Sequence, residues 1–165
     1  MSRRMSTSDL RLSSVPSAKA EMFIRRPAAE VFEAFVDPAI TTQVWFTKSS
    51  GRLSPGAEVT WEWEMYNVSS TARVKEFEPE RRLVVEWNSE EQPTTVAWDF
   101  DGRPDGTFVS ITESGYTGDA DAVTAEALAS TEAFTMVLAN VKALLEHKIT
   151  LNLVADRFPD GIGEH

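Results

Sequence analysis

The sequence contains no cysteine, and this absence removes several kinds of chemistry at once. Without cysteine there is no disulfide bond, no thiol nucleophile, no thiolate zinc site and no iron–sulfur cluster. Histidine is scarce as well, since His147 and the terminal His165 are the only two. One internal histidine cannot build a metal cluster of recognisable spacing. We therefore expect neither a metal nor a cofactor.

The motifs of nucleophilic catalysis and nucleotide binding are also missing. No Gly-x-Ser-x-Gly elbow accompanies His147, so the pattern does not predict a serine hydrolase. No P-loop is present, and Gly161-Ile162-Gly163 lies at the end of the chain with no helix after it to hold a phosphate. A nucleotide site is therefore not expected.

Positive charge is in short supply, and long apolar runs are absent. Sixteen basic against 26 acidic residues give a net charge of −10, which argues against nucleic acid as a partner. No run reaches the roughly 18–20 apolar residues of a membrane span, and residues 1–17 lack the apolar core of a signal peptide. We expect a cytoplasmic protein with a disordered tail at residues 1–17 and a single domain at residues 18–160.

Aromatic side chains, by contrast, are abundant. They make up 10% of the 165 residues and include five Trp and nine Phe. A chain of this length can bury roughly 70% of its surface on folding, so a substantial core is expected. The purpose of so many aromatic rings is the main question that the composition raises.

The order of hydrophobic periodicities predicts an α+β fold. Residues 18–25 alternate like a strand, and two short helical patterns follow at residues 27–36 and about 39–44. From residue 51 to residue 116 the period is two, with short turns between the strands, which indicates an antiparallel meander. Residues 121–155 return to helical spacing, which predicts a long helix that covers one face of the sheet.

Two local signals bear on that last helix. Asp119 or Asp121 can cap its start, because a short acidic side chain accepts hydrogen bonds from the first free backbone amides. Ser130-Thr131 marks a position where the helix could bend, and Pro159-Asp160-Gly161 ends it.

Strand parity places most tryptophans on one face of the sheet, beneath an apolar stripe of the last helix. Large flat rings suit the wall of an apolar pocket, and they suit an ordinary core equally well. Trp45 follows the second helix and is interpreted as a guard at the pocket entrance. The candidate ligand-binding residues are Trp45, Trp61, Trp63, Met65, Trp87, Trp98, Phe100, Glu113, Phe134, Val137, Leu138 and Val141.

Glu113 is the one carboxylate singled out as a weak catalytic candidate. It shares parity with Val109 and Ile111, which places it inward if those two residues face the core. The opposite parity groups Phe108 with Ser110 and Thr112 and places Glu113 in water. Facing apolar walls, its carboxylate could act as an acid, a base or a ligand-orienting group. The sequence leaves both orientations open.

An ordered series of motifs runs through the chain: residues 27–38, Trp45-Phe46, residues 51–63, residues 78–83, Ser114-Gly115-Tyr116, residues 134–147 and residues 151–160. Over residues 18–159 this series resembles the START-like (SRPBCC) superfamily and, within it, the homologues of the activator of heat-shock protein 90 ATPase. One departure is visible, because Ala133-Phe134 stands where members often have Gly-Trp.

The resemblance implies a helix-grip fold, in which a curved antiparallel sheet of about six or seven strands surrounds a long C-terminal helix, with two short helices after the first strand. It also implies an elongated cavity between sheet and helix, where superfamily members bind lipids, sterols, polyketides or other hydrophobic small molecules. We therefore expect binding of a hydrophobic or aromatic small molecule.

Two other functions stay open, and so does the oligomeric state. Some superfamily members are cyclases, dehydratases or hydrolases, which would give Glu113 a role as general acid or base. The resemblance also allows a chaperone-regulating interaction module. The eukaryotic activator has a further N-terminal domain for which this chain has no room, and this weakens the chaperone alternative. A homodimer is also compatible with the sequence.

Overall fold

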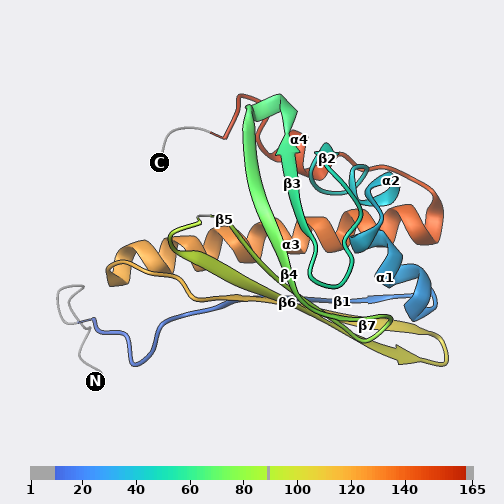
Figure 1. Ribbon diagram of the computed structural model, residues 1–165, viewed down its shortest axis with the longest axis horizontal. Coiled ribbons are helices and arrows are strands. Elements are labelled where there is room, and N and C mark those ends of the chain that lie inside the picture. The colour runs from blue at the N-terminus through green and yellow to red at the C-terminus, as the bar shows by residue number, and fades with distance from the viewer. Residues whose placement is uncertain (1–9, 89, 163–165) are drawn as a thin grey trace, which may run out of the picture.

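One antiparallel sheet organises the fold, with seven strands in the order β1-β7-β6-β5-β4-β3-β2 (Figure 1). The computed structural model describes residues 10–88 and 90–162. The strands are β1 (Ala18–Ile24), β2 (Lys48–Ser49), β3 (Glu58–Trp63), β4 (Val68–Glu78), β5 (Arg82–Asn88), β6 (Pro93–Arg103) and β7 (Gly106–Ser114). The expected meander is confirmed, because β3, β4, β5 and β6 each pair with the next strand along the chain. β1 completes this edge by pairing with β7.

Two short helices carry the chain from one edge of the sheet to the other. Helix α1 (Ala28–Val36) buries Val31, Phe32 and Phe35 against the sheet, as the spacing predicts. Helix α2 (Pro38–Thr41) is shorter than expected: it ends at Thr41, whereas the sequence predicted an end near residue 44. The chain then enters β2 at the far edge of the sheet.

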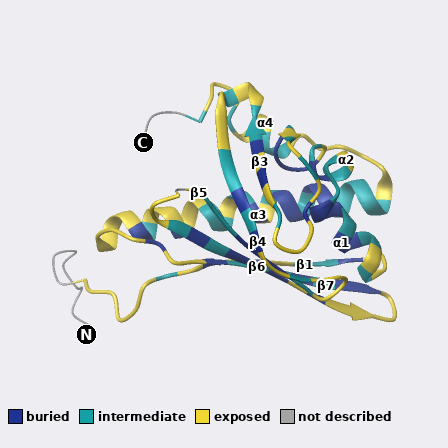
Figure 2. Ribbon diagram, viewed as in Figure 1, coloured by how far each residue is buried: buried dark blue, intermediate teal, exposed yellow. Residues whose placement is uncertain are grey.

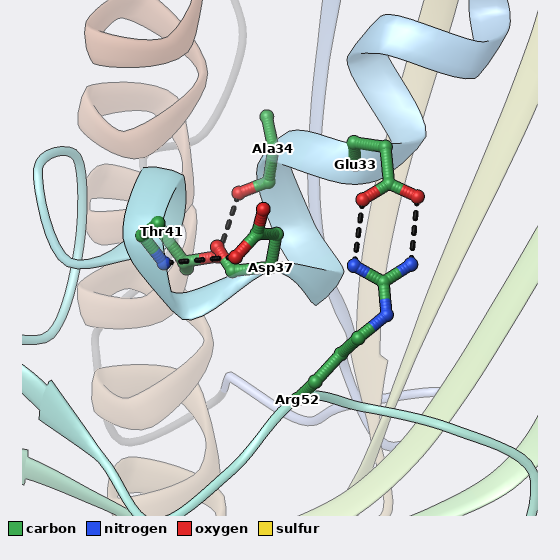
Figure 3. Close-up of polar contacts among 6 residues, drawn as sticks. Glu33, Ala34, Asp37, Thr41 and Arg52 are labelled. Carbon is green, nitrogen blue, oxygen red and sulfur yellow. Dashed lines mark hydrogen bonds and ion pairs between the residues drawn. The ribbon is translucent and has the colours of Figure 1, made fainter.

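Hydrogen bonds fix the junction between these two helices (Figure 3). Asp37 caps α2, and its Oδ1 accepts from the Ala39 amide at 3.0 Å. The Thr41 hydroxyl donates to the Ala34 carbonyl at 2.7 Å, which ties α2 to the last turn of α1. The guanidinium of Arg52 makes two hydrogen bonds of 2.7 Å to the carboxylate of Glu33. These contacts set the direction of the loop that follows α2.

The long helix α3 (Ala120–His147) crosses the inner face of the sheet (Figure 1). Of the two predicted caps, Asp119 is the one observed: its Oδ1 accepts from the Ala122 amide at 2.8 Å. Ser130-Thr131 does not interrupt the helix, because α3 continues through both residues. The helix ends where Lys148 adopts a left-handed conformation, with φ of 56°, and a separate helix α4 (Leu153–Arg157) follows. The α+β helix-grip architecture is confirmed.

By length and composition, α3 would suffice to cross a membrane, and it is the one such helix within residues 10–88 and 90–162. Its apolar stripe has a different use in this fold. Val137, Leu138 and Val141 are almost fully buried. Figure 2 shows buried turns along α3. Residues 1–9 of the expected tail lie outside the described residues, while Leu10 and Leu12 are exposed.

Gly106, at the turn between β6 and β7, provides a test of the sheet edge. A Cβ at this position would lie 2.5 Å from the Ile24 carbonyl oxygen and 2.8 Å from the Phe23 ring. We expect Gly106→Ala to lower the free energy of unfolding by about 2 kcal/mol, because overpacking against backbone forces β1 and β7 apart. Urea denaturation measures the change. Gly51→Ala is the control, since its Cβ would meet only Val59 at 3.9 Å, and an equal loss in both variants would contradict the prediction.

Candidate functional site

The tryptophans meet in one group between the sheet and α3. We call this group the aromatic cluster; its members are Trp45, Phe46, Trp61, Trp63, Trp87, Trp98 and Phe134. Trp45 is at its centre, with ring centroids 4.9 Å from Trp61 and 5.5 Å from Trp87. Its ring also lies 6.2 Å from Trp63 and 6.2 Å from Trp98. The prediction that Trp45 guards an entrance was wrong, because the residue is 7% exposed and packed on all sides.

Most of the cluster is densely packed core. Trp61 is 1% exposed and Trp98 is 0% exposed, and Phe46 stacks on Trp61 at 4.7 Å. The Trp98 indole N–H is buried without an acceptor among the described residues, so ring packing takes precedence there over hydrogen bonding. Phe134 closes the cluster from α3, 5.7 Å from Trp45. A ligand beside Trp61 or Trp98 would have to displace these rings.

Two tryptophans at the margin of the cluster are only half-buried and line a pocket. Trp63 at the end of β3 and Trp87 near the end of β5 pack on the core and also border a pocket of about 380 Å³. The rest of its wall comes from Val68, Ser69, Ser70, Asn88 and Ile162. We call it the Trp63–Trp87 pocket. It is the place where the aromatic cluster reaches the surface.

The other predicted site residues separate into three groups. Val137, Leu138 and Val141 lie on the buried stripe of α3. Phe100 lies near α1, 5.2 Å from Phe32 and away from the Trp63–Trp87 pocket. Met65 does not face inward, because β3 ends at Trp63 and the next residues form a 3-10 turn, η2 (Glu64–Tyr66), that leaves Met65 47% exposed. The strand prediction was therefore two residues too long.

Glu113 is completely buried near the end of β7, with the same inward parity as Val109 and Ile111. Its Oε2 accepts from Trp87 Nε1 at 2.6 Å and from the Thr94 hydroxyl at 2.6 Å. Its Oε1 accepts from the Tyr116 hydroxyl at 2.8 Å. One carboxylate thus ties together the ends of β5, β6 and β7 and the start of the segment that leads to α3.

The direction of these bonds follows from the chemistry of the partners. An indole N–H can only donate, and the Thr94 hydroxyl already accepts from Asn88 Nδ2 at 3.1 Å, so its proton points to Glu113. Neutral donors therefore surround the carboxylate and replace the water that it loses on burial.

Tyr116 stays a donor under ordinary conditions. Burial raises the pKa of Tyr116 far above its usual value, a hydrogen bond with Ser130 opposes the rise, and the charge of Glu113 adds to it. A phenol beside a buried carboxylate would place two negative charges together if it ionised. The Tyr116–Glu113 bond therefore keeps the geometry of the polar group constant.

Asn88 connects the buried carboxylate to the surface. It is the last residue of β5, has a left-handed φ of 73°, and its Nδ2 lies 3.4 Å from Glu113 Oε2. It lines the Trp63–Trp87 pocket and also a second pocket of about 400 Å³ that includes Thr94 and Tyr116. Periodicity did not single out Asn88, Thr94 or Tyr116, because Asn88 and Thr94 lie at strand ends and Tyr116 lies beyond the end of β7. The only signal in the sequence was the Ser114-Gly115-Tyr116 motif.

Comparison with known proteins agrees with this fold. The family model described as Activator of Hsp90 ATPase homolog 1-like protein matches residues 25–146. Protein SSP2350 from Staphylococcus saprophyticus is similar at 26% identity and a TM-score of 0.71, over 82% of this chain and 96% of that one. No curated protein matches the sequence significantly.

Two further solved structures share the fold at lower identity. The Aha1 dimer from Colwellia psychrerythraea is 15% identical, with a TM-score of 0.69 over 80% of this chain and 97% of that one. DynU16, a protein of the dynemicin biosynthetic locus, is 18% identical, with a TM-score of 0.68 over 81% of this chain and 48% of that one. The resemblance first seen in the sequence motifs is confirmed.

Removing the Glu113 carboxylate tests whether it holds the strand ends together. In Glu113→Ala, the donors of Trp87, Thr94 and Tyr116 lose their acceptor inside the protein, each at a cost of about 1–3 kcal/mol. We expect the free energy of unfolding to fall by about 3 kcal/mol or more in urea denaturation. Glu62→Ala is the control, because Glu62 is half-exposed and only forms a surface pair with Lys48 at 3.8 Å. Equal losses would contradict a central role for Glu113.

Alkaline titration tests the protonation of Tyr116. The folded pKa is raised, so above the unfolded value of about 10 the unfolded chain releases a proton that the folded chain keeps. The contribution of Tyr116 to the free energy of unfolding is therefore complete below that pH, and it declines as the pH rises above it. We expect Tyr116→Phe to flatten this decline. Tyrosinate absorbance from Tyr116 near pH 10 in the folded protein would contradict the prediction.

Proposed function

The chain belongs to the family of Activator of Hsp90 ATPase homolog 1-like proteins, and on that premise we propose that it binds a hydrophobic, aromatic small molecule in the Trp63–Trp87 pocket. The observation that supports this most directly is the half-exposed edge of an otherwise buried aromatic cluster. A pocket of about 380 Å³ lies within the usual range of roughly 300–1,000 Å³ for small-molecule sites.

The walls of this pocket have the composition that aromatic ligands require. The rings of Trp63 and Trp87 pack against each other, with centroids 6.0 Å apart at an angle of 47°, and both contribute to the pocket wall. Stacked and edge-on ring contacts stabilise an aromatic ligand beyond the effect of buried area alone. Ser69, Ser70 and Asn88 add polar groups at the rim, which can set the orientation of a ligand.

We favour binding over catalysis because of the state of Glu113. A general acid or base must reach the proton that it transfers, and Glu113 is 0% exposed with neutral donors on both oxygens. A cyclase, dehydratase or hydrolase-like activity would require one of these donors to move away. The enzyme alternative therefore predicts loss of turnover in Glu113→Gln while the ligand still binds.

The family name and the similarity to Aha1 support a second candidate function, a chaperone-regulating interaction module. That structure is described as a dimer, so a homodimer is part of this candidate. A fold shared with a protein of the dynemicin biosynthetic locus supports the small-molecule proposal instead. Addition of the protein to a chaperone ATPase assay distinguishes the two, because only the interaction module would change the rate.

Tryptophan fluorescence tests the proposed ligand class. We expect the emission to change saturably with at least one member of a panel that contains a flavonoid, a sterol and a fatty acid, because Trp63 and Trp87 lose contact with water when the pocket fills. Native mass spectrometry of freshly purified protein is an independent measurement, since a tightly held ligand is retained as added mass. No saturable change with any compound would contradict the proposal.

A variant at the pocket wall tests whether the ligand binds in this pocket. Trp63→Leu removes one of the two flat walls, and we expect the dissociation constant of a responding compound to rise about tenfold or more. Trp63 lies at the pocket rim and not in the deep core, so the fold is expected to survive. Met65→Ala is the matched control, two residues further on but 47% exposed, and should leave the affinity unchanged. Equal effects of both variants would argue against this pocket.

A further inference from the structure

The donors on Glu113 Oε2 are not equivalent. Trp87 and Thr94 donate at 2.6 Å each, whereas Asn88 Nδ2 is 3.4 Å away, close to the limit of a hydrogen bond. Asn88 therefore contributes the weakest of these contacts, and it is the one exposed residue among the three.

The positions of the donors explain this difference. Trp87 and Thr94 face each other across β5 and β6, so strand pairing holds both side chains in place. Asn88 is the last residue of its strand, and its backbone amide donates to Ser70 Oγ at 3.0 Å independently of its side chain. The Asn88 amide can thus swing away while the strand end stays paired, at the cost of its 3.1 Å hydrogen bond to Thr94 Oγ1 and of the long contact with Glu113.

Asn88 contacts Glu113 and also lies at the wall of two pockets. Asn88 lines the Trp63–Trp87 pocket and the second pocket at Thr94 and Tyr116. The Trp87 ring lines the first pocket, and its Nε1 donates a hydrogen bond to Glu113 Oε2. The same indole group therefore contacts both the pocket and this carboxylate oxygen. Once the Asn88 amide moves, a ligand stacked on Trp87 has a route to that oxygen.

From this arrangement we infer that the pocket selects aromatic molecules that carry a hydrogen-bond donor, a ring hydroxyl or amino group, which replaces the Asn88 amide at Glu113 Oε2. The inference rests on the proposed function and specifies its ligand class. The Asn88 contact is long at 3.4 Å, so a ligand donor that reaches normal hydrogen-bond distance makes the stronger bond to the same carboxylate oxygen. Aromatic carboxylates are excluded, because they would bring a second negative charge to a buried one in a chain of net charge −10.

Three matched probes test the donor requirement by titration calorimetry on the full chain. 2-Naphthol has the donor, 2-methoxynaphthalene has the same ring system without it, and 2-naphthoate is anionic. We expect 2-naphthol to bind about tenfold more tightly than 2-methoxynaphthalene, and 2-naphthoate to bind weakest. Similar affinities for the first two would overturn the inference and leave the proposed function standing. If none of the three binds, the proposed function fails and the inference fails with it.

Two variants assign the preference to named residues. Asn88→Gly removes the competing amide and suits the left-handed φ of 73°, so 2-naphthol should bind about threefold more tightly, with 2-methoxynaphthalene changed less. Glu113→Met removes the acceptor in a side chain of similar length, and the preference for 2-naphthol should disappear. Near-ultraviolet circular dichroism checks that this variant folds. If it does not fold, Asn88→Gly decides alone, and a loss of 2-naphthol affinity in that variant would overturn the inference.

Discussion

The packing of the Trp45 ring between the sheet and α3 is the interaction on which the rest of the structure depends. This ring touches the four other tryptophans and Phe134, so it joins β3, β5, β6 and α3 in one contact group. The loop that carries it is held from both sides. The caps of α2 set its start, and Asn140 of α3 donates from Nδ2 to the Val44 carbonyl at 2.9 Å. Helix and sheet are therefore joined through a residue that belongs to neither.

The polar group around Glu113 depends on that packing. Trp87 is wedged between Trp45 and Trp63, which leaves its indole N–H no freedom to turn away from the carboxylate. Burying a charge is costly unless donors replace the lost water, and the ends of three strands supply those donors. Trp87 takes part in both kinds of interaction. Its ring packs on the core and lines the pocket, and its Nε1 donates to Glu113. The same residue therefore belongs both to the core and to the wall of the Trp63–Trp87 pocket.

Local patterns in the sequence predicted much of the fold. Alternation assigned the inward faces of β3, β5 and β6, because side chains of a strand point to opposite sides in strict turn. The Asp119 cap depends only on neighbouring residues, and it was one of the two caps that the sequence predicted. The failures have physical causes as well. Met65 continues the apolar alternation of β3 in the sequence, but the backbone leaves the strand conformation at η2. Ser130-Thr131 does not interrupt α3, because tertiary packing of the helix outweighs the local preference of these two residues.

By itself, the sequence determined the order of elements, the faces of the long strands and the apolar stripe of α3, since each depends on the period of a single segment. Only the tertiary structure decided that Trp45 lies at the centre of the cluster, that Glu113 is buried, and that Asn88 both contacts this carboxylate and lines the pocket. These facts depend on how separate strands pair and on where their ends meet. Periodicity says which side a residue faces, and it says nothing about what lies across from it.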